Sequence, residues 1–181
     1  MKSQSFLNFI IGVFIVSILV FLFYSNNNKN DHKFVNLYEI NLNHYKDLVE
    51  DINLYFDISK QDSIDLSNYY TDDFRFHSFP ASFKKGVITT KEDYIKGFMQ
   101  MRKMNMSLDI GHSIYLPGID QDSYKIDGSV RVYYGAELSL DTNIVEFSGY
   151  RTINFEAGKI SEIWEWADYG GVNLLLSGKS K

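Results

Sequence analysis

The second half of the chain consists of four segments with the composition of β-strands. After Met106 they read SLDIGHSIYL, SYKIDGSVRVYYGAEL, NIVEFSGYRTINF and KISEIWEWAD. Each is rich in β-branched and aromatic residues, and Gly, Asp, Asn or Pro separates one from the next. The compact turn EAGK at 156–159 joins the last two, so we expect these to pair antiparallel. Successive strands of this kind predict an antiparallel sheet.

Helical periodicity dominates the first half. Apolar residues recur at intervals of three and four between 39 and about 60, which predicts one helix with a single apolar stripe. This stripe consists of Tyr45, Leu48, Val49, Ile52, Tyr55 and Phe56. A shorter helix is expected at 64–70, before an extended segment that ends at Pro80. A third is expected in TTKEDYIKGFMQMRKM, where Thr90 and Asp93 have the spacing of a capping box.

The order of these elements predicts an α+β fold. About three helices should cover one face of a curved antiparallel sheet, and the sheet should leave a cavity where it curls over them. No repeat and no second change in composition indicates a further domain. At 181 residues the chain is long enough for one well-buried domain.

An uncharged apolar run lies near the amino terminus. It extends over 19 residues from Phe6 to Tyr24, within the ~17 to 25 that cross a bilayer as a helix. A signal peptide normally has a shorter apolar core and small residues before its cleavage site, so an uncleaved transmembrane anchor is favoured. We expect an anchor or signal segment at 1–25, a polar tether at 26–37 and one domain at 38–181. The domain should lie on the periplasmic or extracellular side, although the flanking lysines leave the orientation open.

Charge and composition exclude several classes of function. Eighteen Lys and Arg stand against 23 Asp and Glu, for a net charge of −5, which argues against nucleic acid as a partner. The absence of Cys excludes disulfides and thiolate nucleophiles. No His pair has the spacing of metal ligands, and Walker and nucleophile-elbow patterns are absent. We therefore expect neither a metal nor another cofactor.

Two motifs, together with the order of elements, indicate a family. The first strand begins in YYTDDFRFHSFP, and the last strand and turn read GKISEIWEWADYGG. With these motifs the chain resembles the SnoaL-like polyketide cyclase branch of the nuclear transport factor 2-like superfamily, over roughly 38–176. The resemblance implies a cone-shaped α+β barrel. It does not imply one reaction, because the superfamily includes isomerases, dehydratases, binding modules and scaffolds. The resemblance is carried by Gly158, Lys159, Ile160, Glu162, Trp164 and Asp168.

Asp168 is the first candidate for catalysis, and the resemblance implies a general acid/base role for it. If no bulge interrupts the strand, Ile160, Glu162, Trp164, Trp166 and Asp168 share one face. An acid beside indole rings loses hydration, so its pKa rises and it can exchange protons near neutral pH. Alternatively, an Asp before YGG accepts hydrogen bonds from turn amides, and the tryptophans fill the core. The sequence leaves both interpretations open.

His77 is the second candidate for catalysis. It shares a face of the first strand with Arg75. If this face looks into the cone, Arg75 would bind an anionic or carbonyl substrate and His77 would carry a proton. A hydrogen-bonded histidine without a catalytic role is the alternative. Aromatic side chains would line the pocket, and phenols would orient a ligand. The ligand-binding candidates are Trp164, Trp166, Arg75, Tyr70 and Tyr134.

Two functions agree with these features, and whether the chain is an enzyme stays open. The first is a membrane-tethered domain that binds a small hydrophobic molecule in an aromatic-lined pocket without turning it over. The second is a cofactor-independent cyclase, isomerase or dehydratase that uses Asp168 as general acid/base. A homodimer through the outer face of the sheet is compatible with both, with Tyr133, Tyr150 and Phe147 as contacts.

Overall fold

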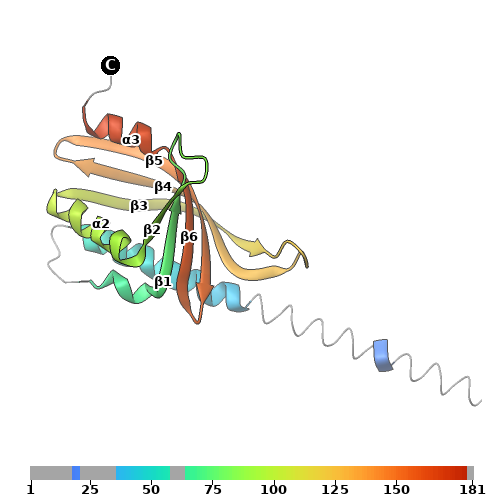
Figure 1. Ribbon diagram of the computed structural model, residues 1–181. Helices are drawn as coiled ribbons and strands as arrows, with labels where there is room; N and C mark the ends of the chain where they lie inside the picture. The colour runs from blue at the N-terminus through green and yellow to red at the C-terminus, as the bar shows by residue number, and fades with distance from the viewer. Residues whose placement is uncertain (1–17, 21–35, 58–63, 179–181) are drawn as a thin grey trace, which may run out of the picture.

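The computed structural model describes residues 18–20, 36–57 and 64–178, and all of its strands belong to one curved sheet (Figure 1). The strand order is β2-β1-β6-β5-β4-β3. A long helix over 36–56 and α2 cover one side, here called the inner face, and the other side is the outer face. After the long helix the elements are η1 (Leu66–Tyr69), β1 (Tyr70–Ser78), β2 (Val87–Thr90), α2 (Lys91–Lys103), β3 (Met106–Ile119), β4 (Ile126–Leu140), β5 (Asn143–Glu156), β6 (Lys159–Ala167) and α3 (Tyr169–Leu176).

The predicted helices are largely confirmed. In the long helix the apolar stripe forms the core, and Tyr45, Leu48 and Ile52 are at most 2% exposed. The Thr90 side chain caps α2 by accepting a hydrogen bond from the Asp93 amide. The helix expected at 64–70 is reduced to the single 3₁₀ turn η1, since Tyr70 already pairs with β6.

The sheet differs from the prediction in two respects. It is not wholly antiparallel, because β1 runs parallel to β6. Residues 87–90, for which no strand was predicted, form β2 and pair antiparallel with β1. Strands β3 to β6 are antiparallel neighbours, as predicted from their succession in the chain. The parallel pair is possible because α2 and four strands separate β1 from β6 in the chain, and such a long connection permits either direction.

A β-bulge in β6 decides which of its side chains face inward. Asn154 lies opposite Glu162 but Phe155 lies opposite Ile160, so β6 contains one extra residue at this point. The alternation that would place Ile160 and Asp168 on one face is therefore interrupted. Ile163 and Glu165 point inward with 1% and 4% exposure.

No helix among the described residues is long and apolar enough to cross a membrane. The run from Phe6 to Tyr24, for which an anchor is predicted, lies outside the described residues except for positions 18–20. Most of the predicted tether at 26–37 also lies outside them.

Replacement by alanine should change the free energy of unfolding in opposite directions at two glycines. A Cβ at Gly149 would overlap the Tyr134 hydroxyl, whereas a Cβ at Gly97 in α2 would meet nothing within 4 Å. We expect Gly149→Ala to lower the free energy of unfolding by about 1 to 3 kcal/mol through overpacking. Gly97→Ala should raise it by about 0.5 to 1 kcal/mol, because alanine is the better helix former. Urea denaturation measures both, and a loss of equal size in the two variants would contradict this packing.

Candidate functional site

A buried ion pair lies on the inner face of the sheet. Arg151 of β5 stands directly opposite Glu165 of β6, and its Nε donates a hydrogen bond to Glu165 Oε1. The two residues are only 9% and 4% exposed. Opposite charges at directly facing positions of neighbouring strands interact closely.

Tyrosines surround the ion pair. The hydroxyls of Tyr134 and Tyr169 donate to Glu165 Oε1 and Oε2, each over 2.6 Å. Arg151 Nη1 donates to the Tyr45 hydroxyl over 3.4 Å, and the guanidinium carbon lies 4.5 Å from the centre of the Tyr134 ring. We call the whole group the inner cluster. It consists of Tyr45, Tyr70, Tyr94, Tyr134, Arg151, Glu165 and Tyr169.

The inner cluster holds two charges in a protein interior. Burial alone would raise the pKa of Glu165, but the Arg151 charge and the hydrogen bonds from Tyr134, Tyr169 and Arg151 outweigh it and hold that pKa below the ordinary range. The pKa of Arg151 is raised by Glu165 despite burial. Burial raises the pKa of Tyr134, so its phenol stays protonated. The cluster thus presents a carboxylate, a guanidinium and neutral hydroxyls.

His77 lies on the outer face instead. Its Nε2 is 3.1 Å from Glu162 Oε1, and its ring stacks on Trp164 with 4.2 Å between ring centres. Glu162 Oε2 accepts hydrogen bonds of 3.1 Å from the Asn154 amide and the Trp164 indole. The histidine therefore belongs to a network that is separated from the inner cluster by the sheet.

Aromatic rings continue across the outer face and form what we call the aromatic column. Rings from β6 alternate in it with a ring from β1 and with the ring of Phe79, the residue that follows β1. The angles between the planes of successive rings are 10°, 21° and 4°. Two tyrosines of β5 and β4 extend it. Trp166 is 42% and Tyr133 is 53% exposed. The column runs in the order His77, Trp164, Phe79, Trp166, Tyr150 and Tyr133.

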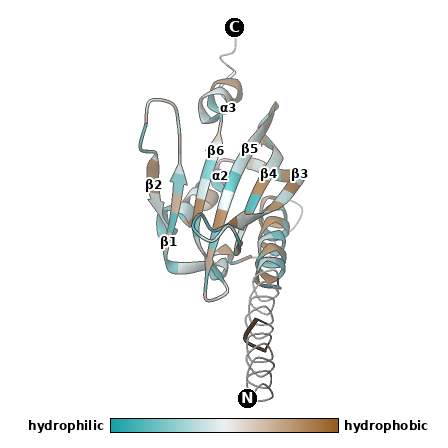
Figure 2. Ribbon diagram, turned by 90° about the vertical axis from the view of Figure 1, so that its right-hand side faces the viewer, coloured by the Kyte–Doolittle hydropathy of each residue, from teal (hydrophilic) through white to brown (hydrophobic). Residues whose placement is uncertain are grey.

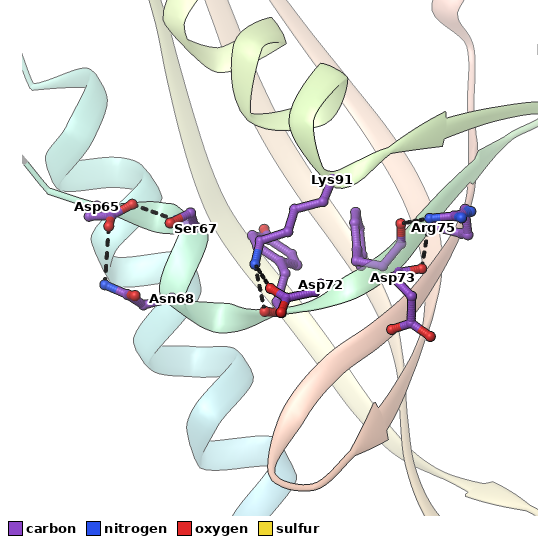
Figure 3. A network of polar contacts seen from close by, with 9 residues as sticks. Asp65, Ser67, Asn68, Asp72, Asp73, Arg75 and Lys91 are labelled. Atoms are coloured by element: carbon purple, nitrogen blue, oxygen red, sulfur yellow. Dashed lines mark hydrogen bonds and ion pairs between the residues drawn. The ribbon is translucent and has the colours of Figure 1, made fainter.

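Arg75 is exposed on β1 and bonds locally. Figure 3 shows its guanidinium donating to the carbonyls of Asp73 and Phe74, over 2.8 and 2.9 Å. In the same view Lys91 of α2 reaches Asp72 at 3.1 Å. Arg75 therefore has no contact with the inner cluster.

A groove of about 670 Å³ runs along α2, outside the inner cluster. Ile95 and Met99 supply its apolar surface, and Lys91, Lys96 and Lys103 are the cations along it. Among residues 18–20, 36–57 and 64–178, no three His, Asp or Glu side chains gather in a way that could hold a metal ion.

Comparisons with known proteins identify the fold. No protein-family model matches the sequence, and no curated protein matches it in sequence. A phenazine biosynthesis-related protein from Pseudomonas aeruginosa is similar in structure, with a TM-score of 0.58 at 11% identity over 81% of this chain and 90% of that chain. A protein assigned as a SnoaL-like polyketide cyclase from Jannaschia sp. CCS1 gives 0.52 at 12% identity over 77% and 92%. A nuclear transport factor 2-like protein from Anabaena variabilis gives 0.51 at 12% identity over 71% and 89%.

The fold is that of the SnoaL-like, nuclear transport factor 2-like proteins. Within it, the candidates predicted from the sequence fall into two groups. Tyr70 and Tyr134 lie in the inner cluster, at 0% and 4% exposure. Arg75, Trp164 and Trp166 lie on the outer face.

Asp168 lies at the start of α3 in this nuclear transport factor 2-like fold. It is exposed, and its Oδ1 accepts a hydrogen bond of 2.9 Å from the Gly171 amide, so it is the N-cap of the helix. This is the turn geometry that the sequence left open as an alternative. The acid that faces the interior is Glu165, three residues earlier.

Sequence reasoning did not select Arg151 or Glu165 as site residues. The sequence does contain a signal for the pair, which is one charged residue among the inward-facing positions of each of two neighbouring strands. In β6 the inward-facing positions are Ile163, Glu165 and Ala167. Without the bulge, however, the turn would place Arg151 opposite Trp164. The signal is therefore visible only once the register is known.

The capping role of Asp168 predicts a difference between two substitutions. Asp168→Ala removes the acceptor for the Gly171 amide and should lower the free energy of unfolding by about 1 kcal/mol. Asp168→Asn should change it far less, because asparagine is as good an N-cap as aspartate. Chemical denaturation measures both. Equal losses in the two variants would show that the charge, and not the cap, stabilises α3.

Proposed function

We propose that this domain is a cofactor-independent enzyme of the cyclase, isomerase or dehydratase type, and that it moves a proton inside the cone. The observation that supports this most is the buried Glu165–Arg151 pair with hydroxyls around it. Replacing both members of a buried ion pair by apolar residues is often neutral or stabilising, whereas removing one member is strongly destabilising. Stability alone therefore does not explain why the chain carries the pair. The structural likeness to a protein assigned as a polyketide cyclase agrees with the proposal at the level of fold alone.

Each group in the inner cluster has a role in this proposal. Glu165 would accept a proton from a carbon beside a carbonyl, and Arg151 would stabilise the negative charge that develops on the carbonyl oxygen. Three hydrogen bonds to Glu165 weaken it as a base. Tyr169 supplies one of them from α3, so displacement of this helix would free Oε2 and open the cluster.

Asp168 is the alternative proton carrier, at the edge of the cone. His77, with Glu162 beside it, would act as a second carrier only on a substrate that binds to the outer face. The geometry favours Glu165 because it is buried next to a cation, whereas Asp168 is exposed.

Proton abstraction can be tested by deuterium exchange from solvent into 1,3-dicarbonyl compounds, followed by NMR. We expect Glu165→Gln to slow catalysed exchange roughly 100- to 10,000-fold, the usual contribution of a general base. Asp168→Asn is the matched control and should leave the rate nearly unchanged. Circular dichroism of both variants checks that they fold. Exchange that survives Glu165→Gln but is lost in Asp168→Asn would reject Glu165 as the base.

Binding without turnover is the second candidate function, and the packing of the interior favours it. Tyr70 and Phe74 are both 0% exposed, whereas the groove along α2 is open. In this case a small hydrophobic molecule would lie against Ile95 and Met99, and residues 6–24 would tether the domain to a membrane. A compound that raises the melting temperature of the chain without undergoing exchange would support this function.

We also propose that two copies of the chain associate through the outer face. Tyr133 and Tyr150 are adjacent there, with 4.7 Å between ring centres, and the aromatic column offers an exposed apolar surface. Phe147, the third expected contact, packs toward the core instead, near Tyr134.

If the chain forms this dimer, a charged side chain introduced at the contact should weaken self-association. Tyr133→Arg should weaken self-association at least tenfold, because it places a charge at the contact. Met99→Arg is the matched control, since Met99 is 49% exposed and belongs to α2 on the opposite side of the sheet. Sedimentation equilibrium measures both. A monomeric unsubstituted chain, or equal effects of the two substitutions, would contradict the proposed contact.

A further inference from the structure

Two hollows adjoin each other along α2, outside the inner cluster. The first is the groove of about 670 Å³ described above, and the second has a volume of about 380 Å³. Ile95 and Met99 line both of them, so the two hollows form one trough, here called the α2 trough. Each hollow is within the range of roughly 300 to 1,000 Å³ that is typical of pockets for small molecules.

The α2 trough has an apolar floor. Leu66 and Phe98 line its second hollow, and both belong to the main core, with 3% and 8% exposure. Met99, which both hollows share, is 49% exposed although its side chain is apolar. Methionine is flexible and polarisable, so it adapts to ligands of irregular shape. These side chains offer an alkyl chain a surface that water covers poorly.

Positive charge is concentrated beside this floor. Residues 81–105 contain six of the 18 Lys and Arg of the chain but only two of its 23 Asp and Glu. Lys96 and Lys103 line the first hollow, and they share a face of α2 with Met99, which is three and four residues away from them. In the part of the chain that the structure describes, neither lysine takes part in an ion pair, whereas Lys91 is paired with Asp72. Two cations are therefore available to a ligand.

The stability of α2 does not account for this arrangement. A cation in the last turn of a helix interacts favourably with the helix dipole, which explains Lys103 but not Lys96 in the middle of the helix. Glu92 lies one turn before Lys96, yet no ion pair joins the two in the described structure. A helix face that only meets water also has no need of Met99 between two lysines. The combination of exposed methionine and unpaired lysines indicates a ligand that is apolar at one end and anionic at the other.

We propose that the α2 trough binds a linear alkyl carboxylate, such as a free fatty acid. The alkyl chain lies against Leu66, Phe98 and Met99, and the carboxylate lies between Lys96 and Lys103. The inference rests on the second candidate function, for which it specifies the ligand, and it is independent of the proposed proton transfer. An anionic lipid in a bilayer has the same chemistry. The geometry points to the free acid, because the chains of a bilayer lipid stay in the bilayer and would not reach the nearly buried floor.

NMR of the methionine methyl groups tests the site directly. The full chain contains five methionines, which can be labelled with ¹³C at the methyl carbon, and Met99→Leu identifies the Met99 signal. In phosphatidylcholine nanodiscs, added decanoate should shift the Met99 signal until it saturates, and the titration gives Kd. The signal of Met106, which begins β3 and does not line the trough, should stay unchanged.

Two double variants separate the role of the charge from that of the alkyl chain. Lys96→Gln with Lys103→Gln should weaken decanoate binding roughly five- to tenfold, since each exposed charge pair contributes little. The same variant should bind decan-1-ol, which has no charge, as well as the unsubstituted chain does. Lys84→Gln with Lys85→Gln is the matched control, because it removes two exposed lysines outside the trough and changes the net charge equally. It should leave both affinities unchanged.

Three results would overturn the inference. They are a Met99 signal that decanoate does not shift, equal losses of decanoate binding in the two double variants, and a shift caused by phosphatidylglycerol in the nanodisc without decanoate, which would assign the trough to bilayer lipid. The second candidate function fails differently. Binding of decanoate and decan-1-ol that neither double variant alters would keep a hydrophobic ligand and reject only its carboxylate. A Met99 signal that neither compound shifts would reject binding in the trough altogether.

Discussion

The domain depends on the pairing of Arg151 with Glu165 across neighbouring strands. Both side chains point inward, so neither charge can return to water while the long helix and α2 cover the inner face. An unpaired charge in this position would be strongly destabilising, so the register that aligns the pair is fixed. This register requires the bulge in β6. The same bulge turns Trp164 and Trp166 outward, so the inner cluster and the aromatic column follow from one local irregularity.

Features that depend on local pattern could be predicted from the sequence. The periodicity of the long helix, the cap at Thr90 and the turn at 156–159 involve residues close together in the chain, and each is present. The parallel pairing of β1 with β6 could not be predicted. Local sequence does not specify which distant strands meet, and α2 and four strands lie between these two.

The candidate site could not be identified from the sequence because the register between β5 and β6 shifts by one residue. Glu156 pairs with Lys159 at the turn, and continuing this count would place Arg151 opposite Trp164. The extra residue in β6 moves Glu165 into that position instead. It also separates the expected common face of Ile160 and Asp168. Nothing in the composition of the strand marks the bulge, so a correct strand assignment left Asp168 open as an inward acid and did not identify Glu165.

Tyr169 connects α3 to the inner cluster through its hydrogen bond to Glu165. The helix has eight residues and lies at the end of the sheet away from the long helix (Figure 1 and Figure 2). Its Val172 and Leu176 pack with Leu138 and Val145 in a small apolar group distinct from the main core. The only hydrogen bond it makes to Glu165 comes from Tyr169. A segment whose apolar contacts are separate from the main core can open at less cost than the global fold, so we propose α3 as the element whose displacement would free Glu165 Oε2. The proton transfer proposed for Glu165 would then require displacement of α3 and leave Arg151 in its buried position.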